Sequence, residues 1–125
     1  MNIFYNNKTD YLEIFRLKVP NYGEPIRKGI IEFRAEKNDK VVGYGIENAT
    51  RALEKFECIS PIEKFSVFVK IARIKHGLTQ VEAAKNLGMK LLPYQRIESG
   101  SNNPTLKTIL KIKSLFPEIS LSDVA

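Results

Sequence analysis

The chain has 125 residues, of which 43% are hydrophobic and 27% are charged, and its formal net charge is +6. This size suits one compact domain or two very small ones, and the hydrophobic content excludes a disordered chain. With no apolar run long enough to cross a bilayer, no apolar signal segment at its start and only one cysteine, we expect a cytoplasmic protein without an internal disulfide.

The positive charge is concentrated in the second half of the chain. Residues 1–61 hold ten Lys/Arg against nine Asp/Glu, whereas residues 62–125 hold ten against five. Such an excess indicates a polyanionic partner, although a solvated lysine-rich surface explains it equally well.

The first half alternates apolar and polar residues in the manner of strands. We expect strands at Ile3–Tyr5, Tyr11–Val19, Ile30–Phe33 and Val41–Ile46, with Lys37–Lys40 as a hairpin turn. The segment between Pro20 and Pro25 should interrupt any regular element. Two glycines in the last strand, Gly43 and Gly45, indicate a bulge or a close backbone approach.

The strand pattern ends near Asn48, where apolar residues take up helical spacing. We predict one short amphipathic helix over Asn48–Glu57, capped by Asn48 or Thr50. The simplest arrangement for residues 1–60 is then a four-stranded antiparallel meander crossed by one helix. We place a domain boundary at Cys58–Pro61 and expect the first module to bind a partner or to dimerise.

The second half, residues 61–125, reads as four to five helices, which makes the whole chain α+β. The first helix should end at His76-Gly77, and Thr79 and Glu82 form a capping box that opens the second. That helix should end at Gly88. A third helix is expected over about Leu91–Glu98, and its Pro93 is tolerated in the first turn.

A fourth helix should begin at Pro104 and end before Pro117. Its buried stripe is predicted to consist of Leu106, Ile109, Leu110, Ile112 and Leu115. One last turn is expected over Ser120–Asp123.

Gln80, Ala84, Gly88, Tyr94 and Ile97 together fit the geometry of a helix-turn-helix. Two short helices that cross steeply need a small residue where their backbones meet, and Ala84 supplies it. They also need a sharp turn, supplied by Gly88, and an apolar inner face, supplied by Tyr94 and Ile97. The spacing of the whole set is more specific than any single match.

The stretch from Ile71 to Leu115 resembles the Xre/Cro helix-turn-helix family. The resemblance rests on Ile-Ala-Arg-Ile-Lys-His-Gly-Leu-Thr-Gln at its start and on Tyr-Gln-Arg-Ile-Glu-Ser-Gly from Tyr94. With Asn-Pro-Thr-Leu-Lys-Thr following from Asn103, it is most similar to the version fused to HicB-type antitoxins. The resemblance implies that Arg73 and Glu98 form a partly buried ion pair, a structural clamp between helices rather than a DNA contact.

The same resemblance implies DNA contacts from the start of the second helix, the outer face of the third and the loop after it. These candidates are Gln80, Lys90, Leu91, Leu92, Gln95, Arg96, Ser99, Ser101, Asn102 and Asn103. Gln80 and the helix N-terminus would hold a phosphate, Arg96 would read guanine, and Gln95 would read adenine or hold the backbone. The loop residues would donate to phosphates.

Leu91 and Leu92, followed by Pro93, depart from this family pattern because polar base-reading residues often occupy these positions. The leucines would contact thymine methyl groups or pack against another domain.

The first half resembles a small uncharacterised β-rich domain family, typically encoded beside a small toxin-like protein. The resemblance rests on Met-x-Ile-x-Tyr at the start and on Val-Val-Gly-Tyr-Gly-Ile-x-Asn-Ala from Val41. The acidic helix-start motif of HicB is not clearly present there.

No catalytic set is visible in the sequence, so we expect no enzyme, no metal and no cofactor. The only histidine, His76, is expected to interact with helix-terminal carbonyls. Asp10, Glu13 and Glu32 are expected to be solvated strand residues.

Three functions remain open at this point. The leading hypothesis is an autorepressing antitoxin that binds double-stranded DNA as a homodimer and neutralises a toxin with its first half. The second is a protein-interaction module with a degenerate helix-turn-helix. The third is a repressor that responds to a small molecule.

Overall fold

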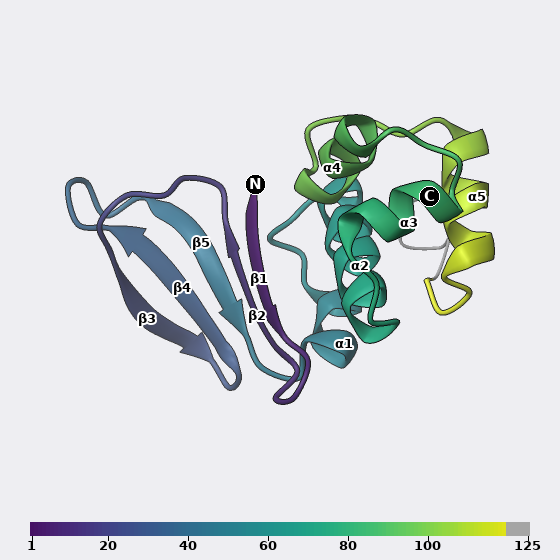
Figure 1. Ribbon diagram of the computed structural model, residues 1–125. Helices are drawn as coiled ribbons and strands as arrows, with labels where there is room; N and C mark the ends of the chain where they lie inside the picture. The colour runs from purple at the N-terminus through teal and green to yellow at the C-terminus, as the bar shows by residue number, and fades with distance from the viewer. Residues whose placement is uncertain (120–125) are drawn as a thin grey trace. The chain divides into compact units, whose positions relative to one another are not determined.

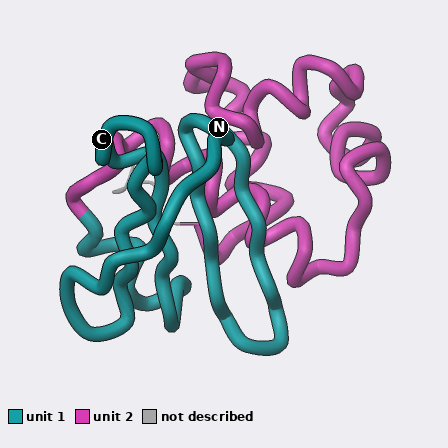
Figure 2. The backbone as a smooth tube through the Cα atoms, turned by 90° about the vertical axis from the view of Figure 1, so that its left-hand side faces the viewer, with its two compact units in different colours: residues 1–56 teal, residues 57–125 magenta. Residues whose placement is uncertain are grey.

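A computed structural model describes residues 1–119, and the chain divides into two compact units, residues 1–56 and residues 57–125 (Figure 2). The α+β class expected from the sequence is confirmed, since an antiparallel sheet precedes a set of helices. The last turn expected at Ser120–Asp123 lies outside the described residues. None of the helices within residues 1–119 is long and apolar enough to cross a membrane.

The first unit contains a five-stranded antiparallel sheet in the order β1-β2-β5-β4-β3 (Figure 1). The strands are β1 (Asn2–Asn6), β2 (Tyr11–Phe15), β3 (Asn21–Arg27), β4 (Ile30–Ala35) and β5 (Val41–Ile46). The predicted four-stranded meander is therefore wrong in its strand count and in its connections, because β2 pairs with β5. The segment expected to be irregular forms β3, an edge strand, where proline is tolerated because one row of N–H groups has no strand partner.

One face of the sheet carries the apolar residues of the first unit. Tyr5, Leu12, Ile46 and Ile30 are aligned across four strands by their register, and all four are buried. The ring of Tyr44 on the same face meets Phe56 edge-on, with centroids 4.9 Å apart. Side chains of alternate residues share a face, so this row follows directly from the period of the strands.

The helix after the sheet is shorter than predicted and is capped differently. In place of one helix over Asn48–Glu57, the chain forms α1 (Ala49–Ala52) and a 3-10 turn, η1 (Leu53–Lys55). Asn48 is the N-cap but makes no side-chain cap bond. The carboxylate of Asp10 accepts instead from the backbone N and the hydroxyl of Thr50, at 3.2 and 2.7 Å.

The strand acids are therefore not simply solvated, as the sequence suggested. Besides capping α1, Asp10 accepts a hydrogen bond from the Tyr5 hydroxyl at 2.6 Å. Glu13 accepts from Tyr11 at 2.8 Å, and Glu32 pairs with Arg34 at 2.5 Å. Tyr11 and Glu13 lie two residues apart in β2, as do Glu32 and Arg34 in β4, because alternate residues of a strand share a face. Of these partners, only Thr50 is distant in sequence from its acid.

The glycines of β5 confirm the predicted bulge and the predicted close approach. The register between β4 and β5 shifts by one residue beside Gly43. A Cβ atom at Gly43 would lie 2.4 Å from the carbonyl oxygen of Ile14 and 2.8 Å from the ring of Phe15. Gly43 pairs with Phe15 on one side and with Phe33 on the other, and the rings of these two residues stack 5.0 Å apart.

The second unit is helical: α2 (Pro61–Lys75), α3 (Gln80–Asn86), α4 (Leu91–Ser99) and α5 (Leu106–Leu115). Its core contains Phe65, Val69, Ala72, Ala83, Ala84, Leu87, Tyr94, Ile97, Ile112, Phe116 and Ile119. The predicted stripe of α5 is wrong at two positions, because Leu106 is 70% exposed and Leu110 is 48% exposed. The buried face of this ten-residue helix is narrower than the predicted stripe of five residues.

Candidate nucleic-acid interface

The start of α3 is fixed by the predicted capping box. The Thr79 hydroxyl accepts from the backbone N of Glu82 at 3.1 Å, and the Glu82 carboxylate accepts from the backbone N of Thr79 at 3.0 Å. These hydrogen bonds favour the ionised acid and lower the pKa of Glu82. The box makes Gln80 the first residue of the helix.

The turn between α3 and α4 depends on Gly88. Its φ of +66° lies in the left-handed region, and a Cβ atom there would have nothing within 4 Å, so conformation rather than space calls for glycine. The backbone N of Met89 donates to the carbonyl of Ala84 at 2.9 Å, which closes the end of α3. The sharp turn predicted at Gly88 is confirmed.

The inner face of α4 packs into the core against α3. Tyr94 and Ile97 belong to the same buried cluster as Ala83 and Ala84, as the helix-turn-helix pattern predicts. Burial and the nearby carboxylate of Glu98 raise the pKa of Tyr94.

The opposite face of α4 is open to solvent. Helical spacing places Leu92, Gln95, Arg96 and Ser99 together on this face. Arg96 is exposed, Leu92 is 55% exposed, and Gln95 is half-buried. Lys90, the N-cap of α4, is exposed beside Leu91, which is 38% exposed.

A chain of polar side chains connects the core of the second unit to this outer face. Arg73 on α2 pairs with the buried Glu98 through two hydrogen bonds, Nε to Oε2 at 2.6 Å and Nη2 to Oε1 at 3.1 Å. Gln80 Nε2 donates to the same carboxylate at 3.2 Å, and Gln95 Nε2 donates to Gln80 Oε1 at 3.0 Å. The structure thus brings together four of the residues singled out in the sequence.

The sequence does not indicate the link between Gln80 and Gln95, and by itself it predicts two separate DNA contacts. The two residues are fifteen positions apart and on different helices, and no local motif signals a bond between their side chains.

The loop after α4 is ordered by its own hydrogen bonds. The hydroxyls of Ser99 and Ser101 lie 2.7 Å apart, and that of Ser99 also donates to the carbonyl of Arg96 at 3.2 Å. Asn102 and Asn103 are exposed next to them. These loop candidates therefore follow directly on the open face of α4.

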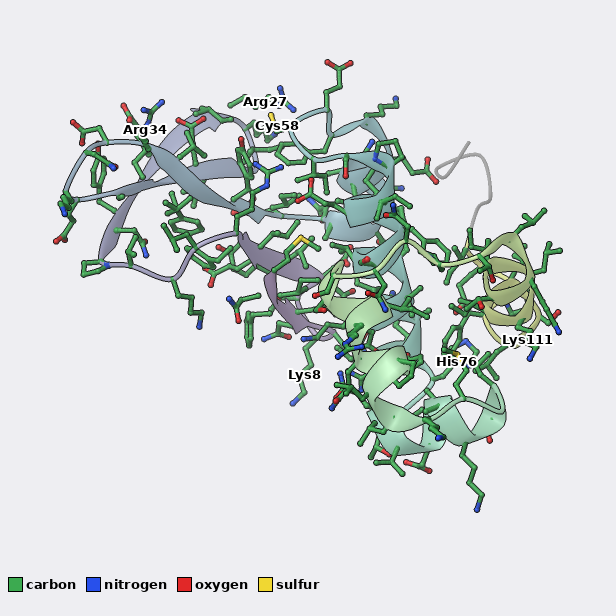
Figure 3. The ribbon with its side chains drawn as sticks, turned by 90° about the horizontal axis from the view of Figure 1, so that it is seen from above. Lys8, Arg27, Arg34, Cys58, His76 and Lys111 are labelled. Atoms are coloured by element: carbon green, nitrogen blue, oxygen red, sulfur yellow. The ribbon has the colours of Figure 1, made fainter. Side chains whose placement is uncertain are left out.

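The side chain of His76 pairs with an acid and not with helix-terminal carbonyls, contrary to the prediction. Its Nε2 lies 2.7 Å from Glu118 Oε1, and its ring meets Phe116 edge-on at 5.0 Å. His76 is labelled in Figure 3. The acid and the aromatic ring come from the segment after α5, which only the tertiary fold brings to the end of α2. Within residues 1–119, no group of three or more His, Cys, Asp or Glu side chains is placed to hold a metal ion.

Comparison with known proteins supports the assignment of this motif. Residues 69–124, somewhat less than half of the chain, match the family described as Helix-turn-helix, which is of the Xre/Cro type expected from the sequence. No curated protein and no solved structure matches the chain. The resemblances to HicB-type antitoxins and to a toxin-associated β-rich domain stay predictions.

Proposed function

We propose, on the premise of the helix-turn-helix match over residues 69–124, that this chain is a DNA-binding transcriptional repressor that acts at its own promoter. The single observation that carries this proposal is the solvent-open face of α4, which bears the exposed Arg96 and the half-buried Gln95. Helix α4 directly follows the capped helix α3 and the glycine turn. In this arrangement the second helix of the motif enters the major groove.

The electrostatics of the second half support the same proposal. Exposed cations lie on α3 (Lys85), at the N-cap of α4 (Lys90), on α4 (Arg96) and on α5 (Lys107 and Lys111). Positive side chains that neutralise DNA phosphates release the counterions bound to them. The logarithm of the affinity for DNA should therefore fall linearly with the logarithm of the salt concentration.

The assigned roles follow from position. Arg96, with two donors in a planar fork, suits the two acceptors of guanine, and Gln95 suits adenine. Gln80, the loop serines and the loop asparagines suit phosphates. Leu91 and Leu92 are exposed enough to meet thymine methyl groups.

The test is fluorescence anisotropy of the full chain with its own upstream DNA and with a scrambled duplex of equal length, over a series of salt concentrations. We expect tighter binding to the upstream DNA and a steep salt dependence with both. Equal affinity for the two duplexes would refute a specific repressor and favour the interaction-module hypothesis.

A homodimer would present two copies of α4 to successive major grooves, about 34 Å apart. The exposed pair Leu106 and Leu110, one turn apart on α5, supports such self-association. Replacing both leucines with lysine should give a monomer in analytical ultracentrifugation, and a dimer that persists would place the contact elsewhere.

We further propose that the repressor is an antitoxin. This role rests on the resemblance of the second half to HicB-type antitoxins and of the first half to a β-rich domain encoded beside toxins. If it is right, the product of the neighbouring gene will be a small protein that co-purifies with this chain and inhibits growth when expressed alone. A neighbour without either property would leave a repressor that is not an antitoxin.

A further inference from the structure

A cavity of about 640 Å³ lies at one end of the sheet in the first unit. It is lined by residues 16, 17, 19 and 20 of the segment that connects β2 to β3, and by residues of the hairpin between β4 and β5. Both segments lie at the same end of the sheet (Figure 1). We propose that this cavity binds a small organic anion with an apolar body, such as an arylalkyl or alkyl carboxylate. Ligand pockets in proteins span roughly 300–1,000 Å³, so the volume is suitable.

Main-chain hydrogen bonds hold the walls of the cavity in place. The backbone N of Glu36 donates to the carbonyl of Pro20 at 3.0 Å, and that of Arg16 donates to the carbonyl of Val42 at 2.8 Å. The hairpin is closed by a bond from the backbone N of Ala35 to the carbonyl of Lys40, at 2.9 Å. Because these bonds join the two lining segments to the sheet, the cavity exists before any ligand binds, which lowers the entropic cost of binding.

The lining is mainly apolar. Leu17, Val19, Val41 and Val42 contribute branched side chains, and Ala35 contributes only a methyl group. Leu17 is 56% exposed, although it is a large hydrophobic residue. Ala35 and Val42 are already buried, so an apolar ligand body would mainly remove Leu17, Val19 and Val41 from water, which is the main driving force for binding in such a site.

The charged residues of the lining decide the sign of the ligand. Three cations, Arg16, Lys37 and Lys40, and one acid, Glu36, line the cavity, and all four are exposed. An anionic head group would lie among the cations while the apolar body fills the cavity. A neutral hydrophobic ligand would leave the cations unused, and a nucleic acid backbone would leave the apolar lining uncovered.

This proposal does not rest on DNA binding, because every lining residue belongs to the first unit. Its failure and the failure of the proposed repressor function are therefore separate outcomes.

The test is a titration of the isotope-labelled full chain with phenylbutanoate and with octanoate, followed by amide NMR shifts. We expect saturable shifts confined to residues 16–20 and 35–42. Phenylbutanol, which has the same body without the charge, should bind more weakly. Absence of saturable shifts with both carboxylates, or equal affinity for the acid and the alcohol, would overturn the proposal.

A charge-reversal pair supplies the matched control. Lys37→Glu with Lys40→Glu should weaken carboxylate binding about fivefold or more, since each exposed ion pair is worth up to roughly 1 kcal/mol. Lys8→Glu with Lys28→Glu makes the same change in net charge at the turns on the opposite end of the sheet and should leave the affinity unchanged. Equal losses in the two double variants would show that only the overall charge matters and would refute the site.

Discussion

Gln95 on the outer face of α4 donates a 3.0 Å hydrogen bond to Gln80 at the start of α3, and Gln80 donates in turn to the buried carboxylate of Glu98 at 3.2 Å. Two side chains that the sequence offered as separate DNA contacts are thus held in one geometry by a residue of the core. A preorganised contact surface loses less side-chain entropy on binding. The relationship also means that a substitution at Gln80 alters the position of Gln95.

Replacing Gln80 with alanine should weaken binding to the upstream DNA and to scrambled DNA through the lost phosphate contact, with a further loss on the upstream DNA where Gln95 is displaced. The expected loss is about 1 kcal/mol, the worth of a typical hydrogen bond, or roughly fivefold in Kd. Anisotropy titrations with both duplexes measure it, with Gln95→Ala as the comparison. A loss confined to the upstream DNA would contradict a phosphate contact and would make Gln80 a residue that positions Gln95.

Arg96→Ala should cost about 1–3 kcal/mol at the preferred site and should relax the base preference there. The reason is that a guanidinium fork donates to two acceptors on guanine, which other bases do not offer in the same arrangement. Competition binding with single-base variants of the site measures both effects. Arg51→Ala removes an exposed arginine of the first unit and should bind as the unaltered chain does. Unchanged binding by Arg96→Ala would remove this residue from the interface.

Glu98→Ala should destabilise the second unit by about 3–5 kcal/mol, because it leaves the partly buried charge of Arg73 without its partner. Glu98 is 3% exposed, and the side chain of Arg73 is 12% exposed. The double variant Arg73→Met with Glu98→Met removes both charges and should regain much of the loss. Thermal melting followed by helical circular dichroism tests this, and an unchanged melting temperature for Glu98→Ala would eliminate the clamp role.

Asp10→Ala should destabilise the first unit by about 1–3 kcal/mol, because the groups on Thr50 and Tyr5 lose their acceptor. Asp39 makes a matched control: its φ of 57° is close to the 54° of Asp10, but its bond to Tyr22 is exposed. Both alanine variants carry the same backbone strain, so denaturant midpoints isolate the cap. Equal losses at the two positions would attribute the effect to strain alone.

The sheet should lose stability at alkaline pH in a range set partly by Tyr11. Burial, together with the hydrogen bond to Glu13, raises the pKa of Tyr11 to about 12, from an unfolded value near 10. The folded state holds this proton more tightly, so the contribution is full below about pH 10 and is lost as the pH rises towards 12. The free energy of unfolding should fall less steeply with pH over this range in Tyr11→Phe than in the unaltered chain. An identical dependence on pH in the two proteins would exclude Tyr11 as the titrating group.

The sequence alone determined the helical second half because its signals are local. The Thr79–Glu82 capping box, the glycine turn at Gly88 and the inner face of α4 are each specified by residues within a few positions of one another, and all three are confirmed. The bulge and close approach at Gly43 were likewise visible, because a strand glycine signals a missing side chain wherever its neighbours lie.

Only the tertiary structure decided the order of the strands, the strand at Asn21–Arg27 and the capping of α1 by Asp10. It also decided that Gln80 meets Gln95 and that two loops enclose an apolar cavity. Each of these joins segments far apart in the chain, and their pairing depends on which surfaces are buried together. Local periodicity gives the elements their faces, but the choice of partner for each face is a property of the whole fold.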